Sequence, residues 1–163
     1  MRSLVLLLIV VSTFSGCYSF KDVSIPPEVK TVRVNYIENR APYVNPQLSP
    51  QLTDRLRQKI NNQTRLSLIQ GDEADYDIAG AVTGYSETTA GISGKEASTN
   101  RLMVTVHVIF KNRLDEKANF EADVTRNFDF NAGLSLQQAE AQLSDEILRN
   151  VTDEIFNRIF SNW

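Results

Sequence analysis

Three long segments of alternating apolar and polar residues constrain the fold of this chain more than any other feature. They span Tyr76 to Thr89, Leu102 to Phe110 and Phe120 to Phe130. Alternation with a period of two places successive side chains on opposite faces of a β-sheet. Short connections with glycine, asparagine and aspartate separate the segments, so we predict an antiparallel meander. One face of this meander must be covered, and the other must face water.

The second and third segments show which face is covered. We predict a flexible loop before the second segment, containing Gly91, Gly94 and Asn100. In the third segment, acidic residues and a threonine alternate with the apolar ones and mark the wet face. The covered face is predicted to carry the apolar side chains Leu102, Val104, Val106, Val108, Phe110, Phe120, Ala122, Val124, Phe128 and Phe130.

A long C-terminal helix is predicted to provide the cover. Ser135 and Gln138 have the spacing of a capping box, in which the two residues satisfy N–H groups at the start of a helix. A helix with one apolar side is best explained by packing across a sheet. Its apolar side is predicted to consist of Leu136, Leu143, Ile147, Leu148, Val151, Ile155, Phe156, Ile159 and Phe160.

The residues before the meander indicate a β-α-β unit. Thr31 to Tyr36 alternates, with Val32, Val34 and Tyr36 expected on one buried side, and Leu66 to Ile69 is a short second strand. Two strands joined by one helix lie parallel when they share a sheet. A polar loop, residues 38–47, is expected to follow the first strand.

The helix between these strands is predicted to start with Ser49 as N-cap and Pro50 at its first position. Leu52, Leu56 and Ile60 form its apolar stripe. Together these elements predict an α+β fold, a two-layer sandwich. Its sheet is mixed or antiparallel with four to five strands, and two helices pack on one face.

The N-terminus has the layout of a secretory signal. A positive charge at Arg2 precedes the apolar run Leu4 to Val11, and small residues lead to Cys17, the only cysteine. The run is too short to cross a membrane, which takes about 20 apolar residues. Residues 14–17 (FSGC) resemble the bacterial lipobox, which implies a covalent diacylglyceryl and N-acyl lipid at Cys17. The alternative is ordinary cleavage that leaves a free thiol or an intermolecular disulfide.

These features divide the chain into three parts. Residues 1–16 are predicted to be a lipoprotein signal peptide, residues 17–28 a lipidated tether containing Pro26 and Pro27, and residues 29–163 a single α+β domain. The formal net charge is −3. Such a mildly acidic chain is not expected to bind nucleic acid.

No pattern in the sequence predicts catalysis, a cofactor or a metal site. His107 is the only histidine and lacks partners for a metal cluster, so we expect a partly solvated strand residue. The acidic run Asp72 to Asp77 lacks the glycine of a calcium loop and is expected to be a solvated turn. Gly91 to Lys95 lacks the Lys-Ser/Thr of a phosphate-binding loop. We therefore predict a binding protein and not an enzyme.

Short phrases spread along the mature chain resemble the LptE lipopolysaccharide-assembly lipoproteins, in particular their Bacteroidetes-type branch. Each phrase alone is weak, but their joint order is specific. The phrases include Ile25-Pro26-Pro27, Glu38-Asn39-Arg40-Ala41-Pro42, Thr64-Arg65-Leu66, Ala81-Val82-Thr83-Gly84-Tyr85 and Asn100-Arg101-Leu102.

The resemblance implies an outer-membrane lipoprotein on the periplasmic side, seated in the lumen of an LptD-like β-barrel as plug and assembly factor. It also implies binding of lipopolysaccharide and its delivery to the outer leaflet. Lys95 and Arg101 are candidate phosphate contacts, or else ordinary surface charges. Asn39, Arg40 and Tyr43 are candidate partner contacts, or else set the loop conformation. The alternative function is a structural or small-ligand-binding lipoprotein of another envelope complex.

Overall fold

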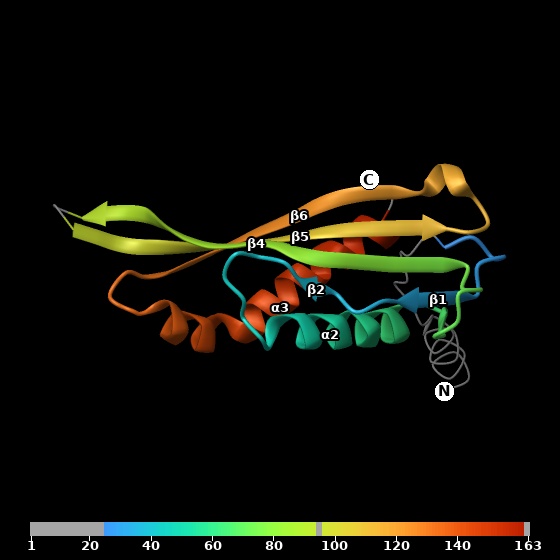
Figure 1. The fold of residues 1–163 in the computed structure, drawn as a ribbon, viewed down its shortest axis with the longest axis horizontal. Helices are drawn as coiled ribbons and strands as arrows, with labels where there is room; N and C mark the ends of the chain where they lie inside the picture. Colours follow the sequence, from blue (N-terminus) through green and yellow to red (C-terminus); the bar gives the residue numbers. More distant parts are fainter. Residues whose placement is uncertain (1–24, 94–95, 162–163) are drawn as a thin grey trace, which may run out of the picture.

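One sheet covered on a single face by two helices makes up the fold (Figure 1). The computed structural model describes residues 25–93 and 96–161, so the predicted signal peptide and Cys17 lie outside the described residues. The elements are β1 (Thr31–Val34), β2 (Glu38–Asn39), α2 (Leu48–Gln63), β3 (Ser67–Leu68), β4 (Tyr76–Ser93), β5 (Glu96–Asn112), the 3-10 helix η2 (Glu116–Ala118), β6 (Phe120–Asn131) and α3 (Leu136–Phe160).

The described residues form a mixed, six-stranded sheet in the order β3-β1-β4-β5-β6, with the short β2 also paired to β4. β1 pairs in parallel with β3 and with β4, whereas β4, β5 and β6 pair antiparallel. This confirms the predicted α+β sandwich, its parallel β-α-β unit and its meander. The sheet has more strands than expected because the predicted polar loop contains β2.

The first strand is shorter than predicted. β1 ends at Val34, and Tyr36 is 54% exposed, so its predicted burial is wrong. Ile37 turns inward instead and is 3% exposed. The cause is a switch of hydrogen-bond partner, since the N–H of Ile37 donates to the hydroxyl of Thr53 on α2 at 3.0 Å and no longer follows the strand.

β4 and β5 form a hairpin that is longer than predicted. Gly91 pairs with Thr99, and Asn100 pairs with Thr89, so both predicted loop residues lie in strands. Gly94 and Lys95 fall outside the described residues. Threonine favours extended backbone, and continued ladder pairing offsets the cost of glycine here. The glycine does disturb the strand pairing, because the register between β4 and β5 shifts on both sides of Gly91.

Both helices carry the apolar faces that the sequence predicts. Ser135 Oγ accepts the N–H of Gln138 at 3.3 Å, and Gln138 Oε1 accepts the N–H of Ser135 at 3.0 Å, which confirms the capping box at the start of α3. The buried core between helices and sheet includes the fully covered side chains of Val32, Leu52, Leu56, Ile60, Val82, Leu102, Val104, Val106 and Val151.

The start of α2 differs from the prediction. Gln47 is the N-cap residue, and Ser49 lies one residue inside the helix with its hydroxyl buried and unpaired. The chain turns earlier because the side-chain oxygen of Asn45 accepts the N–H of Gln47 at 3.0 Å. Neither α2 nor α3 is long and apolar enough to cross a membrane.

The first described residues lie at the end of the molecule that holds β1, opposite the tip of the β4–β5 hairpin (Figure 1). Arg65, just after α2, holds them there. Its guanidinium donates to the carbonyl oxygens of Ile25 at 2.9 Å and Pro26 at 2.6 Å. The chain therefore joins the domain at a defined point.

Candidate functional site

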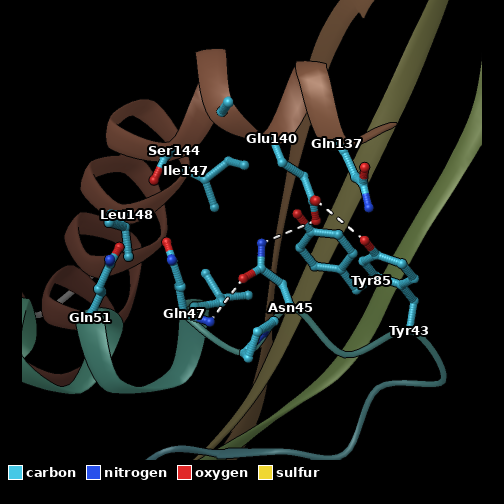
Figure 2. Close-up of a pocket in the computed structure, with 13 residues that line it drawn as sticks. Tyr43, Asn45, Gln47, Gln51, Tyr85, Gln137, Glu140, Ser144, Ile147 and Leu148 are labelled. Atoms are coloured by element: carbon cyan, nitrogen blue, oxygen red, sulfur yellow. Dashed lines mark hydrogen bonds between the residues drawn. The ribbon is translucent and has the colours of Figure 1, made fainter. Parts of the chain in front are cut away.

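A pocket of about 320 Å³ opens between the loop that follows β2, the start of α2 and the first half of α3 (Figure 2). Three elements distant in sequence meet here because α3 extends past the start of α2 along the sheet. Tyr43 comes from the loop, Tyr85 from β4 and Glu140 from α3.

Two stacked tyrosines attach the loop to the sheet. The rings of Tyr43 and Tyr85 lie 5.5 Å apart between centroids, at an interplanar angle of 20°. Tyr85 is 4% exposed, whereas Tyr43 is 39% exposed. Tyr85 therefore fixes the position of the stack, and Tyr43 presents part of its surface to solvent.

Glu140 ties the loop to α3. Its Oε2 accepts the hydroxyl of Tyr43 at 3.3 Å, and its Oε1 accepts the side-chain amide of Asn45 at 3.1 Å (Figure 2). Asn39 holds the same loop through two further hydrogen bonds. Its side-chain amide donates to the carbonyl oxygen of Asn45 at 3.2 Å, and its side-chain oxygen accepts the N–H of Ala41 at 3.1 Å. The loop is thus held in one shape by hydrogen bonds at both ends.

The pocket carries a weak negative charge. Burial raises the pKa of the Tyr43 and Tyr85 phenols, and the Glu140 carboxylate raises both further. Both phenols therefore remain protonated at neutral pH and act as hydrogen-bond donors. Glu140 is the only charged side chain among the described lining residues. Such a pocket suits uncharged polar ligands better than phosphates.

The predicted phosphate contact Arg101 lies elsewhere. It is on β5, next to the buried Leu102, so it points away from the helices. Its guanidinium donates to both carboxylate oxygens of Asp129 on β6, at 2.6 and 2.8 Å. This pairing raises the pKa of Arg101 and lowers the pKa of Asp129. Lys95 lies outside the described residues.

The three predicted partner contacts separate in the structure. Asn39 and Tyr43 converge on the pocket, one by positioning Asn45 and the other by lining the cavity. Arg40 instead donates to Glu38 at 2.8 Å in an exposed pair. Asn45, Tyr85 and Glu140 also line the pocket, and no pattern in the sequence predicted them as site residues. Tyr85 reaches the covered face only because the register shifts between Val82 and Gly84, which the period-two alternation of the sequence does not show.

His107 is partly exposed beside two carboxylates, as its predicted place on the wet face implies. Its Nδ1 lies 2.8 Å from Asp123 Oδ1, and its Nε2 lies 3.4 Å from Glu121 Oε2. Hydrogen bonding to Asp123, with a smaller contribution from Glu121, raises the pKa of His107. Within residues 25–93 and 96–161, no group of three or more His, Cys, Asp or Glu could hold a metal ion.

Three solved structures share this fold at low identity. A minor lipoprotein from Acinetobacter baumannii is 16% identical, with a TM-score of 0.51, and the match covers 80% of this chain and 91% of that one. The hypothetical protein CT253 from Chlamydia trachomatis is 11% identical, with a TM-score of 0.55 and coverage of 80% and 95%. PelC from Paraburkholderia phytofirmans, a dodecamer, is 12% identical, with a TM-score of 0.51 and coverage of 85% and 95%.

Sequence comparison carries the assignment further than the shared fold does. A search of curated proteins found no matching sequence. The sequence model of the family described as lipopolysaccharide-assembly, LptE, matches residues 29–159. This match spans nearly all of the described sheet and both helices and confirms the resemblance found in the sequence. The chain therefore belongs to the LptE lipopolysaccharide-assembly family.

Proposed function

We propose that this protein is a non-catalytic outer-membrane lipoprotein, anchored through lipid on Cys17. In this proposal it occupies the lumen of an LptD-like β-barrel and binds lipopolysaccharide for transport to the outer leaflet. The observation that carries the proposal is the family match over residues 29–159. The domain division into residues 1–16, 17–28 and 29–163 belongs to the same proposal.

The uncovered face of the sheet supports a fit inside a barrel. Polar side chains on this face pair across β5 and β6, as in the Arg101–Asp129 ion pair and, four residues along β5, the Thr105 and Thr125 hydroxyls 3.0 Å apart. Barrel interiors of this class are polar. A face whose polar groups already have partners can approach such a wall without leaving buried groups unpaired.

Arg101 supports lipopolysaccharide binding by its geometry. A guanidinium that already engages two carboxylate oxygens presents the fork that also fits a phosphate. Asp129 competes for that fork, because its negative charge occupies Arg101 and repels an approaching phosphate. In this proposal, lipid phosphate replaces Asp129, and Lys95 adds a second positive charge.

The competition gives a test with two opposite outcomes. Lipopolysaccharide binding is measured with the full chain in mild detergent. Arg101→Gln should weaken binding, and Asp129→Asn should strengthen it. Arg40→Gln is the matched control, because Arg40 also forms an exposed ion pair but lies in the loop that follows β2. Unchanged binding in both Arg101→Gln and Asp129→Asn would exclude this contact.

Barrel binding and anchoring are tested in the native envelope. Extraction of tagged protein in mild detergent should recover a large β-barrel partner, identified by mass spectrometry. Cys17→Ala should shift the protein out of the outer-membrane fraction. Recovery without a barrel contradicts the plug role, and unchanged membrane partitioning contradicts the anchor.

The alternative, a structural subunit of another envelope complex, is favoured by one observation. The fold is shared with PelC, which forms a dodecamer. A ring of this chain in solution, seen as one high-mass species by light scattering, would favour that alternative over the barrel plug.

A further inference from the structure

The pocket lined by Glu140 plays no part in the lipopolysaccharide contact proposed at Arg101, yet its size and lining fit a ligand. Its volume of about 320 Å³ lies at the lower end of the range for small-ligand sites. Apolar side chains of Leu48, Ile147 and Leu148 line part of it, and amide groups line the rest. This mixture is typical of sites that bind a compact ligand with both an apolar and a polar face.

Hydrogen-bonding groups at the mouth are open to a ligand. Gln51, Gln137 and Ser144 line the pocket and are exposed. An amide both donates and accepts, and a hydroxyl does the same. Glu140 accepts hydrogen bonds from Tyr43, Asn45 and Tyr85, yet a carboxylate has about four acceptor positions. The pocket therefore retains both donors and acceptors for a ligand with several hydroxyl groups.

The charge of the lining residues favours an uncharged ligand. Glu140, as the only charged group among the described lining residues, disfavours anions. Its charge is also partly compensated by Tyr43 and Asn45, which weakens the attraction for cations. Tyr43 adds a partly exposed aromatic surface beside these polar groups.

We propose that this pocket binds an uncharged sugar ring. The hydroxyl groups of the ring bond to Glu140, Gln137 and Ser144, while its C–H face packs on the apolar and aromatic lining. The inference rests on the proposed function only for the origin of the sugar, which is a glycan part of lipopolysaccharide or a strand of the cell-wall glycan.

Calorimetric titration tests the proposal with the full chain in mild detergent. The first probe is a neutral hexose oligosaccharide of the lipopolysaccharide core, free of phosphate and of the acidic core sugar. The second is an oligomer of N-acetylglucosamine, the sugar of the cell-wall glycan that carries no carboxylate. At least one probe should bind, and the affinity should be insensitive to salt because the ligand is uncharged. The probe that binds identifies the source of the sugar.

Exposed mouth residues provide the variants. The double substitution Gln137→Ala and Ser144→Ala should weaken binding about tenfold, since two hydrogen bonds are lost. Gln142→Ala is the matched control, because Gln142 is exposed on the same helix but does not line the pocket. It should bind like the wild type.

The inference is overturned if neither probe binds, or if the double variant binds as tightly as the wild type. Such a result would leave the proposed function standing, because that is tested by the dependence of intact lipopolysaccharide binding on Arg101. Conversely, if Arg101→Gln leaves binding of intact lipopolysaccharide unchanged while the sugar probe still binds, the proposed phosphate contact fails and the sugar pocket stands.

Discussion

Thr31 and Asp75 are joined by three hydrogen bonds that tie β1 to the residue preceding β4. Thr31 donates to Asp75 Oδ2 from its N–H and from its hydroxyl, both at 3.0 Å, and its hydroxyl accepts the N–H of Asp75 at 3.0 Å. Lys30 N–H and Arg113 donate to the same carboxylate. Asp75 is 8% exposed, so the prediction of a solvated turn is wrong at this residue.

Because of these hydrogen bonds, we expect the free energy of unfolding to fall at acidic pH. Hydrogen bonds led by the Lys30 N–H lower the pKa of Asp75 to about 2. A carboxylate with a depressed folded-state pKa contributes stability above its unfolded pKa of about 3.9, and that stability is lost as the pH falls toward 2. Urea unfolding of the wild type at pH 6, 4 and 2.5 should show this loss.

Asp75→Asn should lower the free energy of unfolding by about 2 kcal/mol at pH 7, because charge-assisted hydrogen bonds are weakened. It should also flatten the dependence on acidic pH. Asp145→Asn, at a side chain that is 98% exposed, is the control and should leave the urea midpoint nearly unchanged. Equal pH profiles for Asp75→Asn and the wild type would contradict the assigned role.

His107 gives a pH dependence of the opposite sign. Because the pKa of His107 is raised in the folded state, its contribution is full below the unfolded value of about 6.5 and is lost as the pH rises through the folded pKa. The imidazole proton shifts, followed by NMR titration, should report a pKa above the unfolded value. Asp123→Asn should lower this pKa, whereas Asp145→Asn should not.

Gly80 is predicted to tolerate no side chain. A Cβ at this position would lie 2.6 Å from the backbone carbonyl oxygen of His107 on β5. Backbone in the middle of a paired hairpin cannot move aside cheaply, so Gly80→Ala should destabilise the protein by about 1–3 kcal/mol. Gly71→Ala is the control, since the three atoms nearest to a Cβ there all belong to the end of the flexible Glu73 side chain. Thermal unfolding compares the two; similar melting temperatures would refute the clash.

The capping box of α3 can be tested by keeping or removing its acceptor. Ser135→Ala should lower the free energy of unfolding by about 1 kcal/mol, because the N–H of Gln138 loses its partner. Ser135→Asp retains an acceptor and should stay within a few tenths of the wild type. Chemical denaturation measures both, and equal losses would show that the acceptor at residue 135 is not what stabilises the start of α3.

Local patterns predicted most of the fold. The Ser135–Gln138 box and the Leu52, Leu56 and Ile60 stripe depend on spacing within one helix, so the sequence alone was sufficient. Alternation likewise predicted the faces of β5 and β6. The errors arose where a partner from another element decided the outcome, as when Thr53 drew Ile37 inward and left Tyr36 exposed.

The pocket could not be predicted for the same reason. Tyr43 and Glu140 are 97 residues apart in sequence, and their contact depends on how far α3 extends along the sheet. Asn39, Arg40 and Tyr43 were nevertheless predicted as partner contacts or as residues that set the conformation of this proline-containing loop, and Asn39 and Tyr43 do lie at the pocket. Nothing in the sequence indicated that α3 is the element against which this loop packs.

In the anchored state proposed above, the Arg65 contact to Ile25 and Pro26 would set where the domain joins its membrane tether. With lipid on Cys17, as proposed, the stretch from residue 17 to residue 25 would reach at most about 28 Å when fully extended. The hairpin tip lies at the opposite end, and the 18 residues of β4 span roughly 60 Å. In that proposed state, the base of the molecule would stay close to the lipid headgroups, while the tip of the hairpin would lie farther from the bilayer than the tether alone could reach.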